Sequence, residues 1–255
     1  MRDITYPPVL LTAKTLFKLG GMKFTKSGGE HIPKKGGAIL AANHIGYVDF
    51  IFDGFAAIPS GRVVRFMAKK DAFDNKISGP IMRSMHHIPV DRAQGDASYK
   101  MAVDYARKGE IVGIFPEATI SRSFEIKELK TGAVRMAAEA GVPLIPMVTW
   151  GTQLLKTKDH DSDLKGRGKH ISLYVGAPIA VTGKDPIAET AQLRAAMAEL
   201  LDKAIAEYPV SPEGQWWAPA RLGGTAPTPE EAKRLDEEEL AARAARKAAK
   251  SAEKD

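Results

Sequence analysis

Seven short apolar runs, separated by stretches in which apolar residues recur at helical spacing, constrain the fold of this 255-residue chain more than any other feature. The runs cover residues 22–26, 38–42, 63–68, 88–90, 111–115, 144–148 and 171–175. The helical patterns cover about 47–58, 71–85, 97–108, 130–140 and 186–207. Strands that alternate with helices form a mainly parallel sheet with helices on both faces. The sequence therefore predicts an α/β fold, a single domain with a mainly parallel central sheet flanked by helices.

The N-terminal end departs from this pattern. Residues 7–19 predict an amphipathic helix, which Gly20-Gly21 ends. Its apolar face contains Val9, Ala13, Leu16 and Phe17. Such a helix either packs on the core or lies in a lipid interface with its lysines near anionic headgroups. We assign residues 1–20 to this helix and residues 21–208 to the central domain.

The C-terminal end, residues 209–255, contains a Pro- and Gly-rich linker followed by a tail of Ala, Glu, Lys and Arg. This composition predicts a solvated helix or a disordered end, whose charges take no part in chemistry. Trp216-Trp217 stands out in the linker. The pair either packs back onto the domain or anchors the chain at a membrane interface.

The amino-acid composition excludes several kinds of site and indicates the kind of partner. The chain has no cysteine, which excludes disulfides, thiolate metal sites and a cysteine nucleophile. The net charge is +6, and residues 1–35 contain seven Lys or Arg against Asp3 and Glu30. A basic end favours an anionic partner, and without a nucleic-acid motif we expect a membrane surface and no nucleic acid. With no signal peptide and no run of about 18 apolar residues, we expect a cytosolic or peripheral protein.

The strongest chemical signal is His44 followed by Asp49, at the point where the run 38–42 ends and a helical pattern begins. Ligands of α/β proteins bind outside the carboxyl ends of strands. On one ideal helix, residues five apart point about 140° away from each other, so we expect His44 on a loop and Asp49 in the first helical turn. An imidazole held by a carboxylate is the pair that general-base catalysis needs.

Cations follow the next two strands along the chain. Lys69 and Lys70 end the third run, and Arg92 follows the fourth. In a parallel sheet these ends face the same side as His44, so we expect Lys69 or Lys70, with Arg92, to bind a phosphate there, and the alternative is that they are surface charges. The neighbouring pair His86-His87 is not expected to bind a metal, because adjacent side chains on a strand diverge and no third ligand follows at a recognisable spacing.

The fifth run leads into Glu117, small hydroxyl residues and further cations. Glu117 is suited to accept a hydrogen bond from a hydroxyl group, and Arg122 or Lys130 to neutralise a phosphate. A helix that begins near Lys130 adds free backbone N–H groups. The segment therefore predicts a site for a polyol phosphate.

Together these segments resemble the four ordered blocks of the glycerolipid acyltransferase family, which includes the 1-acylglycerol-3-phosphate acyltransferases. The blocks are Asn43-His44 with Asp49, Gly79 through Val90-Asp91-Arg92, Phe115-Pro116-Glu117 with Thr119 and Ser121, and Val142-Pro143 with Ile145-Pro146. The similarity covers about residues 20–180. It implies a peripheral enzyme on the cytoplasmic face of the cell membrane that moves a fatty acyl group from acyl-CoA or acyl carrier protein to a lysophospholipid hydroxyl, without cofactor or metal.

The third block departs from the usual Phe-Pro-Glu-Gly-Thr-Arg-Ser. Ala118 replaces the glycine and Ile120 replaces the arginine. The phosphate contact that the family implies is therefore expected at Arg122, with Arg92 next, and the family pattern places Glu117, Thr119 and Ser121 around the substrate.

The resemblance implies direct acyl transfer. His44 is expected to act as the base, Asp49 to orient it, and Asn43 or backbone N–H groups to stabilise the oxyanion. A thioester is already activated, and the chain has neither a cysteine nor a Gly-x-Ser-x-Gly elbow, so no acyl-enzyme is expected.

Other functions remain open at this point. Within this class of enzyme, glycerol 3-phosphate, another lysophospholipid and a glycolipid are alternative acceptors. Outside this class stand a non-catalytic lysolipid-binding protein and a hydrolase that uses the same His/Asp pair on water. Retention of both His44 and Asp49 argues against the non-catalytic alternative.

Overall fold

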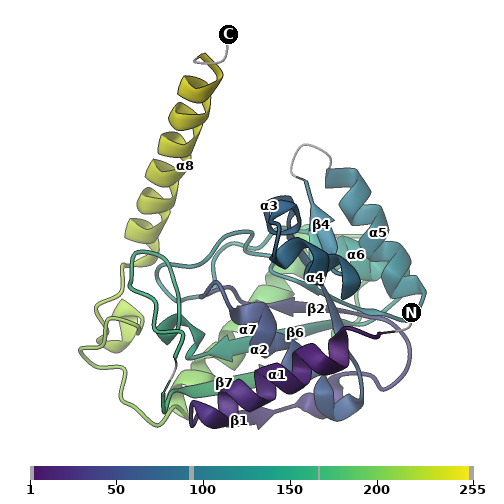
Figure 1. The fold of residues 1–255 in the computed structure, drawn as a ribbon, viewed down its shortest axis with the longest axis horizontal. Coiled ribbons are helices and arrows are strands. Elements are labelled where there is room, and N and C mark those ends of the chain that lie inside the picture. Colours follow the sequence, from purple (N-terminus) through teal and green to yellow (C-terminus); the bar gives the residue numbers. More distant parts are fainter. Residues whose placement is uncertain (1–2, 92–94, 166, 253–255) are drawn as a thin grey trace.

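The computed structural model describes residues 3–91, 95–165 and 167–252, and its centre is one seven-stranded sheet (Figure 1). The strands lie in the order β1-β7-β6-β2-β5-β3-β4. All neighbouring pairs are parallel except β6 and β7, which are antiparallel. The strands are β1 (Lys23–Ser27), β2 (Ala38–Ala42), β3 (Val64–Lys69), β4 (Ile88–Val90), β5 (Ile111–Ile114), β6 (Leu144–Trp150) and β7 (His170–Val175). The predicted α/β fold and all seven predicted strands are confirmed.

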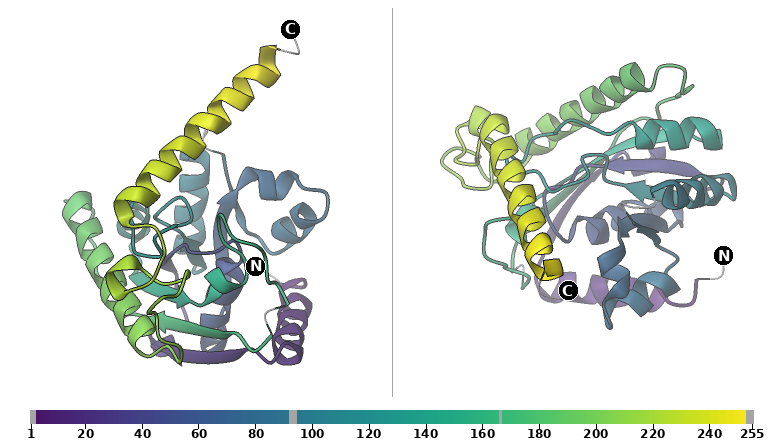
Figure 2. Two further views of the ribbon diagram at one scale, coloured as in Figure 1. Left: turned by 90° about the vertical axis from the view of Figure 1, so that its left-hand side faces the viewer. Right: turned by 90° about the horizontal axis from the view of Figure 1, so that it is seen from above.

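Helices cover both faces of the sheet, and Figure 2 shows α7 and α1 on opposite sides of it. The helices are α1 (Tyr6–Leu19), α2 (Asp49–Ala56), α3 (Lys70–Asp74), α4 (Ser78–Ser84), α5 (Gly95–Arg107), α6 (Gly132–Ala140), α7 (Pro186–Ala206) and α8 (Pro229–Ala252). Helices α5, α6 and α7 pack on one face, and α1 and α2 on the other. Strand β2 is buried along its whole length, with Ile39 and Ala41 on the first face and Leu40 on the second. A strand covered on both faces is apolar throughout, which explains the continuous run in the sequence.

One predicted helix, 71–85, is wrong. The structure divides it into α3 and α4 at Asn75, whose backbone is extended (ψ 135°). The Asn75 side chain accepts hydrogen bonds from the backbone N–H groups of Ile77 and Ser78, at 2.9 and 3.1 Å. An asparagine that binds the backbone two and three residues ahead competes with the helix and starts a new one.

Helix α1 has two different faces. The Phe17 ring stacks on Phe52 with 4.8 Å between ring centroids, and it also contacts Phe24 and Phe55. Leu16, expected on the same face as Phe17, instead lies exposed. Packing on the core therefore holds for one face of the helix only. Within the described residues no helix is long and apolar enough to cross a membrane.

The linker after α7 packs back onto the domain. Trp217 is buried and its ring contacts Trp150 and Tyr208 edge to face, while Trp216 stacks on His160 with 3.9 Å between centroids. Helix α8 then projects away from the rest of the chain (Figures 1 and 2). Of the two alternatives for Trp217, packing on the domain is confirmed.

Candidate active site

His44 and Asp49 meet at the carboxyl end of β2, as their spacing predicts. His44 lies on the loop after the strand, and Asp49 is the first residue of α2. The distance from His44 Nδ1 to Asp49 Oδ2 is 2.9 Å. The carboxylate is fully buried, whereas the imidazole side chain is 21% exposed. A carboxylate at Nδ1 fixes the tautomer in which Nε2 carries the lone pair, so the free nitrogen can accept a proton.

Asp49 is held by three further donors. Its Oδ2 accepts hydrogen bonds from the backbone N–H groups of Ile45 and Gly46, both at 2.8 Å, and its Oδ1 accepts from the Thr152 hydroxyl at 2.6 Å. A Cβ at Gly46 would lie 3.0 Å from Asp49 Oδ1 and from the Lys156 carbonyl oxygen, so this close approach favours glycine. The loop and the first turn of α2 therefore position the carboxylate before any substrate binds.

A second carboxyl group lies one turn further along α2. Asp53 is fully buried, and its Oδ1 accepts a hydrogen bond from the Thr149 hydroxyl. Burial, and then the charge of Asp49, raises the pKa of Asp53 well above its usual range. Burial and the neighbouring carboxylate therefore favour the protonated form of Asp53.

The loop after β5 supports His44 from the other side. The Phe115 ring stacks on the imidazole with 4.3 Å between centroids. Glu117 is buried, and its Oε1 accepts a hydrogen bond from the His44 backbone N–H at 2.9 Å. Ser121 N–H in turn donates to the His44 carbonyl oxygen at 2.7 Å. The third sequence block therefore fixes the backbone of the first.

The two departures from the family pattern have structural consequences. Ala118 adopts a left-handed conformation with φ 61°, where the pattern has glycine. A residue with a Cβ costs about 1–2 kcal/mol in this conformation. Ile120 is buried with 4% of its surface exposed, so position 120 contributes apolar packing in place of a cation.

Arg122 lies in a group of cations that we call the cationic cluster: Arg122, Lys127 and Lys158. The Arg122 side chain is 8% exposed, and its guanidinium binds Asp159 at 2.5 Å and Glu239 at 3.0 Å. Asp236 also accepts from Arg122. Asp236 and Glu239 belong to α8, so the tail is a helix that forms ion pairs with the central domain. No sequence signal pointed to Lys158, because it comes from a loop that follows β6.

The side chains of two predicted substrate ligands already form hydrogen bonds with the backbone of the protein. The Asn43 side chain is fully buried and pairs with the Thr149 backbone, accepting from its N–H at 2.7 Å and donating to its carbonyl oxygen at 3.1 Å. The Ser121 hydroxyl is buried and donates to the Glu125 carbonyl oxygen at 2.8 Å. Asn43 therefore ties β2 to β6, and neither side chain is placed for the substrate contact predicted for it.

The remaining predicted cations are spread along the carboxyl edge of the sheet. Lys69 pairs with Asp71, and Lys70 pairs with Asp91 at 3.3 Å, and all four side chains are at least 36% exposed. Lys130 is exposed just before α6. Arg92 lies outside the described residues. Thr119, by contrast, lies at the cationic cluster, since its hydroxyl accepts a hydrogen bond from Lys127 Nζ at 2.7 Å.

The comparisons with known proteins agree with this geometry. The family model described as Acyltransferase matches residues 23–150, which is half of the chain and contains His44, Asp49 and Glu117. The 1-acyl-sn-glycerol-3-phosphate acyltransferase of Bacillus subtilis is 35% identical over 189 residues, which cover 74% of this chain and 88% of that protein. The chain belongs to the acyltransferase family. The resemblance given by the four sequence blocks is confirmed.

Further relatives of this acyltransferase carry the same description. The 1-acyl-sn-glycerol-3-phosphate acyltransferase of Borreliella burgdorferi is 31% identical over 138 residues, which cover 52% of this chain and 54% of that protein. Among solved structures, the 1-acyl-sn-glycerophosphate acyltransferase PlsC from Thermotoga maritima aligns with a TM-score of 0.61 at 22% identity. That alignment covers 82% of this chain and 86% of the PlsC chain, and it shows a shared fold.

Proposed function

We propose that this acyltransferase moves a fatty acyl group from acyl-CoA or acyl carrier protein to the free hydroxyl of a 1-acylglycerol 3-phosphate, giving phosphatidic acid. The observation that carries the proposal is the 2.9 Å contact between His44 Nδ1 and a fully buried Asp49 carboxylate. The names of the relatives support the choice of acceptor. The fold places the pair at the sheet edge where α/β proteins bind their ligands.

In the proposed mechanism His44 Nε2 removes the proton from the acceptor hydroxyl as its oxygen attacks the thioester carbonyl carbon. Asp49 stabilises the imidazolium that forms. The tetrahedral intermediate then expels the thiolate of the donor, and the imidazolium returns its proton to that sulfur. The products are an ester and a free thiol, so protons and electrons balance without any covalent intermediate on the protein.

We also propose that α1 holds the enzyme peripherally on the cytoplasmic face of the membrane. Ile4 just before the helix, and Leu11, Leu16 and Leu19 on its outward face, are between 61% and 79% exposed. The hydroxyls of Thr12 and Thr15 on the same face donate to backbone carbonyl oxygens of Pro8 and Leu11, both at 2.9 Å. Because these hydroxyls are already satisfied, the whole face can enter an apolar phase at little cost.

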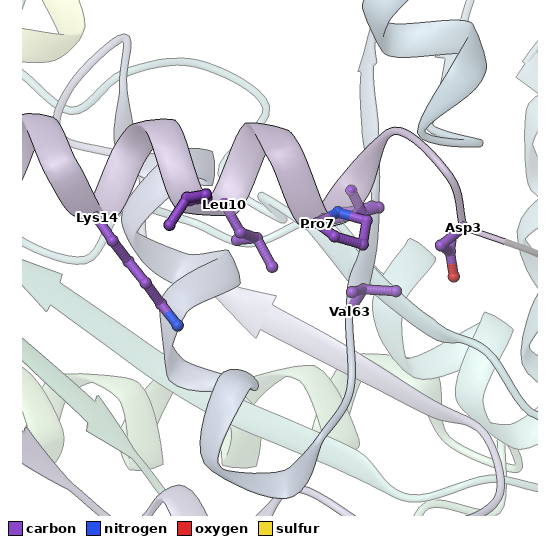
Figure 3. A pocket seen from close by; sticks show the side chains of 7 residues that line it. Asp3, Pro7, Leu10, Lys14 and Val63 are labelled. Carbon is purple, nitrogen blue, oxygen red and sulfur yellow. The ribbon is translucent and has the colours of Figure 1, made fainter.

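The surroundings of this face fit a lipid surface. A pocket along the helix is lined by Asp3, Tyr6, Pro7, Leu10, Leu11, Lys14 and Val63, as Figure 3 shows. Lys14 and Lys18 are exposed beside the apolar residues, where an ammonium group can reach anionic headgroups. Donor and acceptor chains would then reach the enzyme from the lipid phase.

The decisive experiment follows release of CoA from acyl-CoA in the presence of single acceptors: 1-acylglycerol 3-phosphate, glycerol 3-phosphate, a lysophospholipid without a phosphate monoester, and a glycolipid. We expect release that depends on 1-acylglycerol 3-phosphate, with formation of phosphatidic acid. Release that needs no acceptor would assign the protein to the hydrolases. Release that depends on another acceptor would keep the reaction and change the substrate. The same assay with acylated acyl carrier protein in place of acyl-CoA shows which thioester is the donor.

A further inference from the structure

The cationic cluster is occupied by carboxylates from the chain's own C-terminal helix. Asp236 accepts from all three cations: from Arg122, from Lys127 at 2.5 Å and from Lys158 at 2.9 Å. Glu239, one turn later on α8, accepts from Lys158 at 2.9 Å and from Arg122 at 3.0 Å. The two side chains add two negative charges to three cations, of which Arg122 also binds Asp159 at 2.5 Å, and Glu239 pairs in addition with Arg243 of its own helix.

This arrangement matches the chemistry of a phosphate monoester. Such a group carries about 1.5–2 negative charges at pH 7 and presents three acceptor oxygens. Arginine and lysine side chains that converge on one point are the groups that bind it. Asp236 and Glu239 supply the same charge and four oxygens from a single helix face, so α8 presents the cluster with a substitute for a phosphate.

The cluster also borders the catalytic residues. Lys127 N–H donates to Glu117 Oε2 at 3.2 Å, and the other oxygen of the same carboxylate binds the His44 backbone. On the second side, Thr157 donates through its hydroxyl to the Ile45 carbonyl oxygen at 2.6 Å. Both segments that supply the lysines are therefore bonded to the loop that carries His44.

Helix α8 has stabilising interactions of its own that do not involve the domain. Thr228 and Glu231 form a capping box, in which Thr228 N–H donates to the Glu231 carboxylate at 2.9 Å and Glu231 N–H to the Thr228 hydroxyl at 3.3 Å. Arg234 pairs with Glu238 at 2.6 Å, one turn apart on the helix surface. These interactions all lie within the helix, so they persist if α8 separates from the cluster.

The contacts between α8 and the domain are mainly ionic. Among the described side chains of α8, Ala232 alone is buried. Partial burial raises the pKa of Asp236, but hydrogen bonds from Lys127 and Lys158 outweigh it, and the pKa is lowered overall. A hydrogen bond from Lys158 lowers the pKa of Glu239. Both carboxylates are thus ionised at neutral pH, and an anion can compete with them for the same cations.

We propose that α8 is an autoinhibitory cover: Asp236 and Glu239 occupy the site of the acceptor's phosphate, and a phosphate monoester displaces them when it binds. The proposal rests on the proposed function for its ligand, and it adds a competition within the chain. Part of the acceptor's binding free energy is used to release the helix. A cover that is closed nine-tenths of the time raises the apparent dissociation constant about 10-fold.

The first test compares two double variants of the full chain. Asp236→Asn with Glu239→Gln removes the charges that bind the cluster, and Glu237→Gln with Glu238→Gln removes two charges from the exposed side of the same helix. We expect the first pair to lower KM for 1-acylglycerol 3-phosphate by about 3–10-fold, with kcat and the KM for acyl-CoA unchanged. The matched control should leave all three constants alone. An unchanged or raised acceptor KM in the first pair would overturn the proposal.

The second test needs no catalysis, so it separates this proposal from the proposed function. The chain has no cysteine, which allows a single pair of spin labels at Glu199→Cys on α7 and Ala244→Cys on α8, both exposed positions. Millimolar glycerol 3-phosphate should move the label distance away from its ligand-free value, and phosphatidic acid vesicles should do so if the headgroup of a bilayer is the source. Glycerol and phosphatidylcholine vesicles are the controls.

Each outcome of the label experiment either supports or rejects the autoinhibitory cover. A distance that shifts with either phosphate source supports the cover, even in a protein that transfers no acyl group to 1-acylglycerol 3-phosphate. A distance that stays fixed at saturating phosphate in both forms shows that Asp236 and Glu239 are permanent structural partners of Arg122, and the cover is then rejected even if acyl transfer is found.

Discussion

Glu117 joins the loop that carries His44 to the cationic cluster through a single buried carboxyl group, accepting from the His44 backbone at 2.9 Å with one oxygen and from the Lys127 backbone at 3.2 Å with the other. Both bonds favour the ionised form. Burial nevertheless dominates and raises the pKa of Glu117 to about 7. The position of His44 is therefore linked to a group that titrates near neutral pH.

This link predicts how stability depends on pH. The folded protein keeps the Glu117 proton up to about pH 7, whereas the unfolded chain releases it near the ordinary value of 4.5, so the free energy of unfolding falls as pH rises through this window. The full effect is about 3 kcal/mol. Glu117→Gln should remove this slope in urea unfolding measured from pH 4.5 to 7.5.

Two comparisons make the measurement specific. Burial lowers the pKa of His87 to about 4, so His87 contributes in the opposite sense below pH 6.5, and the prediction concerns the difference between variant and parent. Glu237→Gln, at an exposed position of α8, is the control and should leave the slope unchanged. Parallel curves for Glu117→Gln and the parent would show that Glu117 is ionised throughout this range in the folded protein.

The two members of the dyad should fail in different ways. His44→Ala should lower kcat by about 10²–10⁴-fold, the usual contribution of a general base, with little change in the melting temperature because the imidazole is partly exposed. Asp49→Asn should lower both kcat and the melting temperature, because a neutral amide loses the charge that strengthens the hydrogen bonds from His44, Ile45 and Gly46. Turnover and thermal unfolding of the same samples separate these effects. A His44→Ala enzyme with near-parental turnover would exclude the proposed mechanism.

Ala118 offers a test on stability alone. Ala118→Gly should raise the free energy of unfolding by about 1 kcal/mol, because glycine adopts φ 61° without the Cβ clash. Ala195→Gly, at an exposed position inside α7, is the matched control and should lower it by about the same amount. Chemical unfolding gives both values. A loss of stability in Ala118→Gly would mean that the loop does not hold this conformation in solution.

The sequence predicted the parts of the site that depend on local spacing and on the order of strands. His44 and Asp49 could be placed because an apolar run, a polar break and a helical pattern follow each other within 15 residues. Asn43 could not be assigned correctly, because its partner is the backbone of Thr149, more than a hundred residues away. A sequence shows that a polar side chain is present, but it does not show which distant backbone group already satisfies it.

The cationic cluster shows the same limit over a longer range. Arg122 and Lys127 lie in a segment that the sequence singled out, but Asp236 comes from a tail whose composition is typical of a solvated helix. Neither the spacing nor the periodicity of α8 distinguishes Asp236 from its neighbour Glu237. Only the structure shows which of the two meets the domain: Asp236 is partly buried at the cluster and Glu237 is exposed.

The two faces of α1 give the last prediction. Leu11 and Leu16 are 66% and 61% exposed, so replacing both by Glu should leave the fold intact. A buried apolar side chain contributes about 1.5–3 kcal/mol to transfer out of water, and each lysine near an anionic surface about 1 kcal/mol. The double variant should therefore no longer sediment with anionic vesicles. It should keep its activity on short-chain, water-soluble acceptors.

Phe17→Glu is the matched variant on the other face of the same helix. Its ring stacks on Phe52, so this change should cost about 3 kcal/mol or more of stability and appear as a lower melting temperature. Binding of the parent protein should also weaken with salt, since the lysines are screened over about 8–10 Å at physiological ionic strength. Vesicle binding that survives the Leu11 and Leu16 changes in a folded protein would place the membrane contact elsewhere. The exposed Ile77 and Ile81 of the α3–α4 region would then be the next residues to replace.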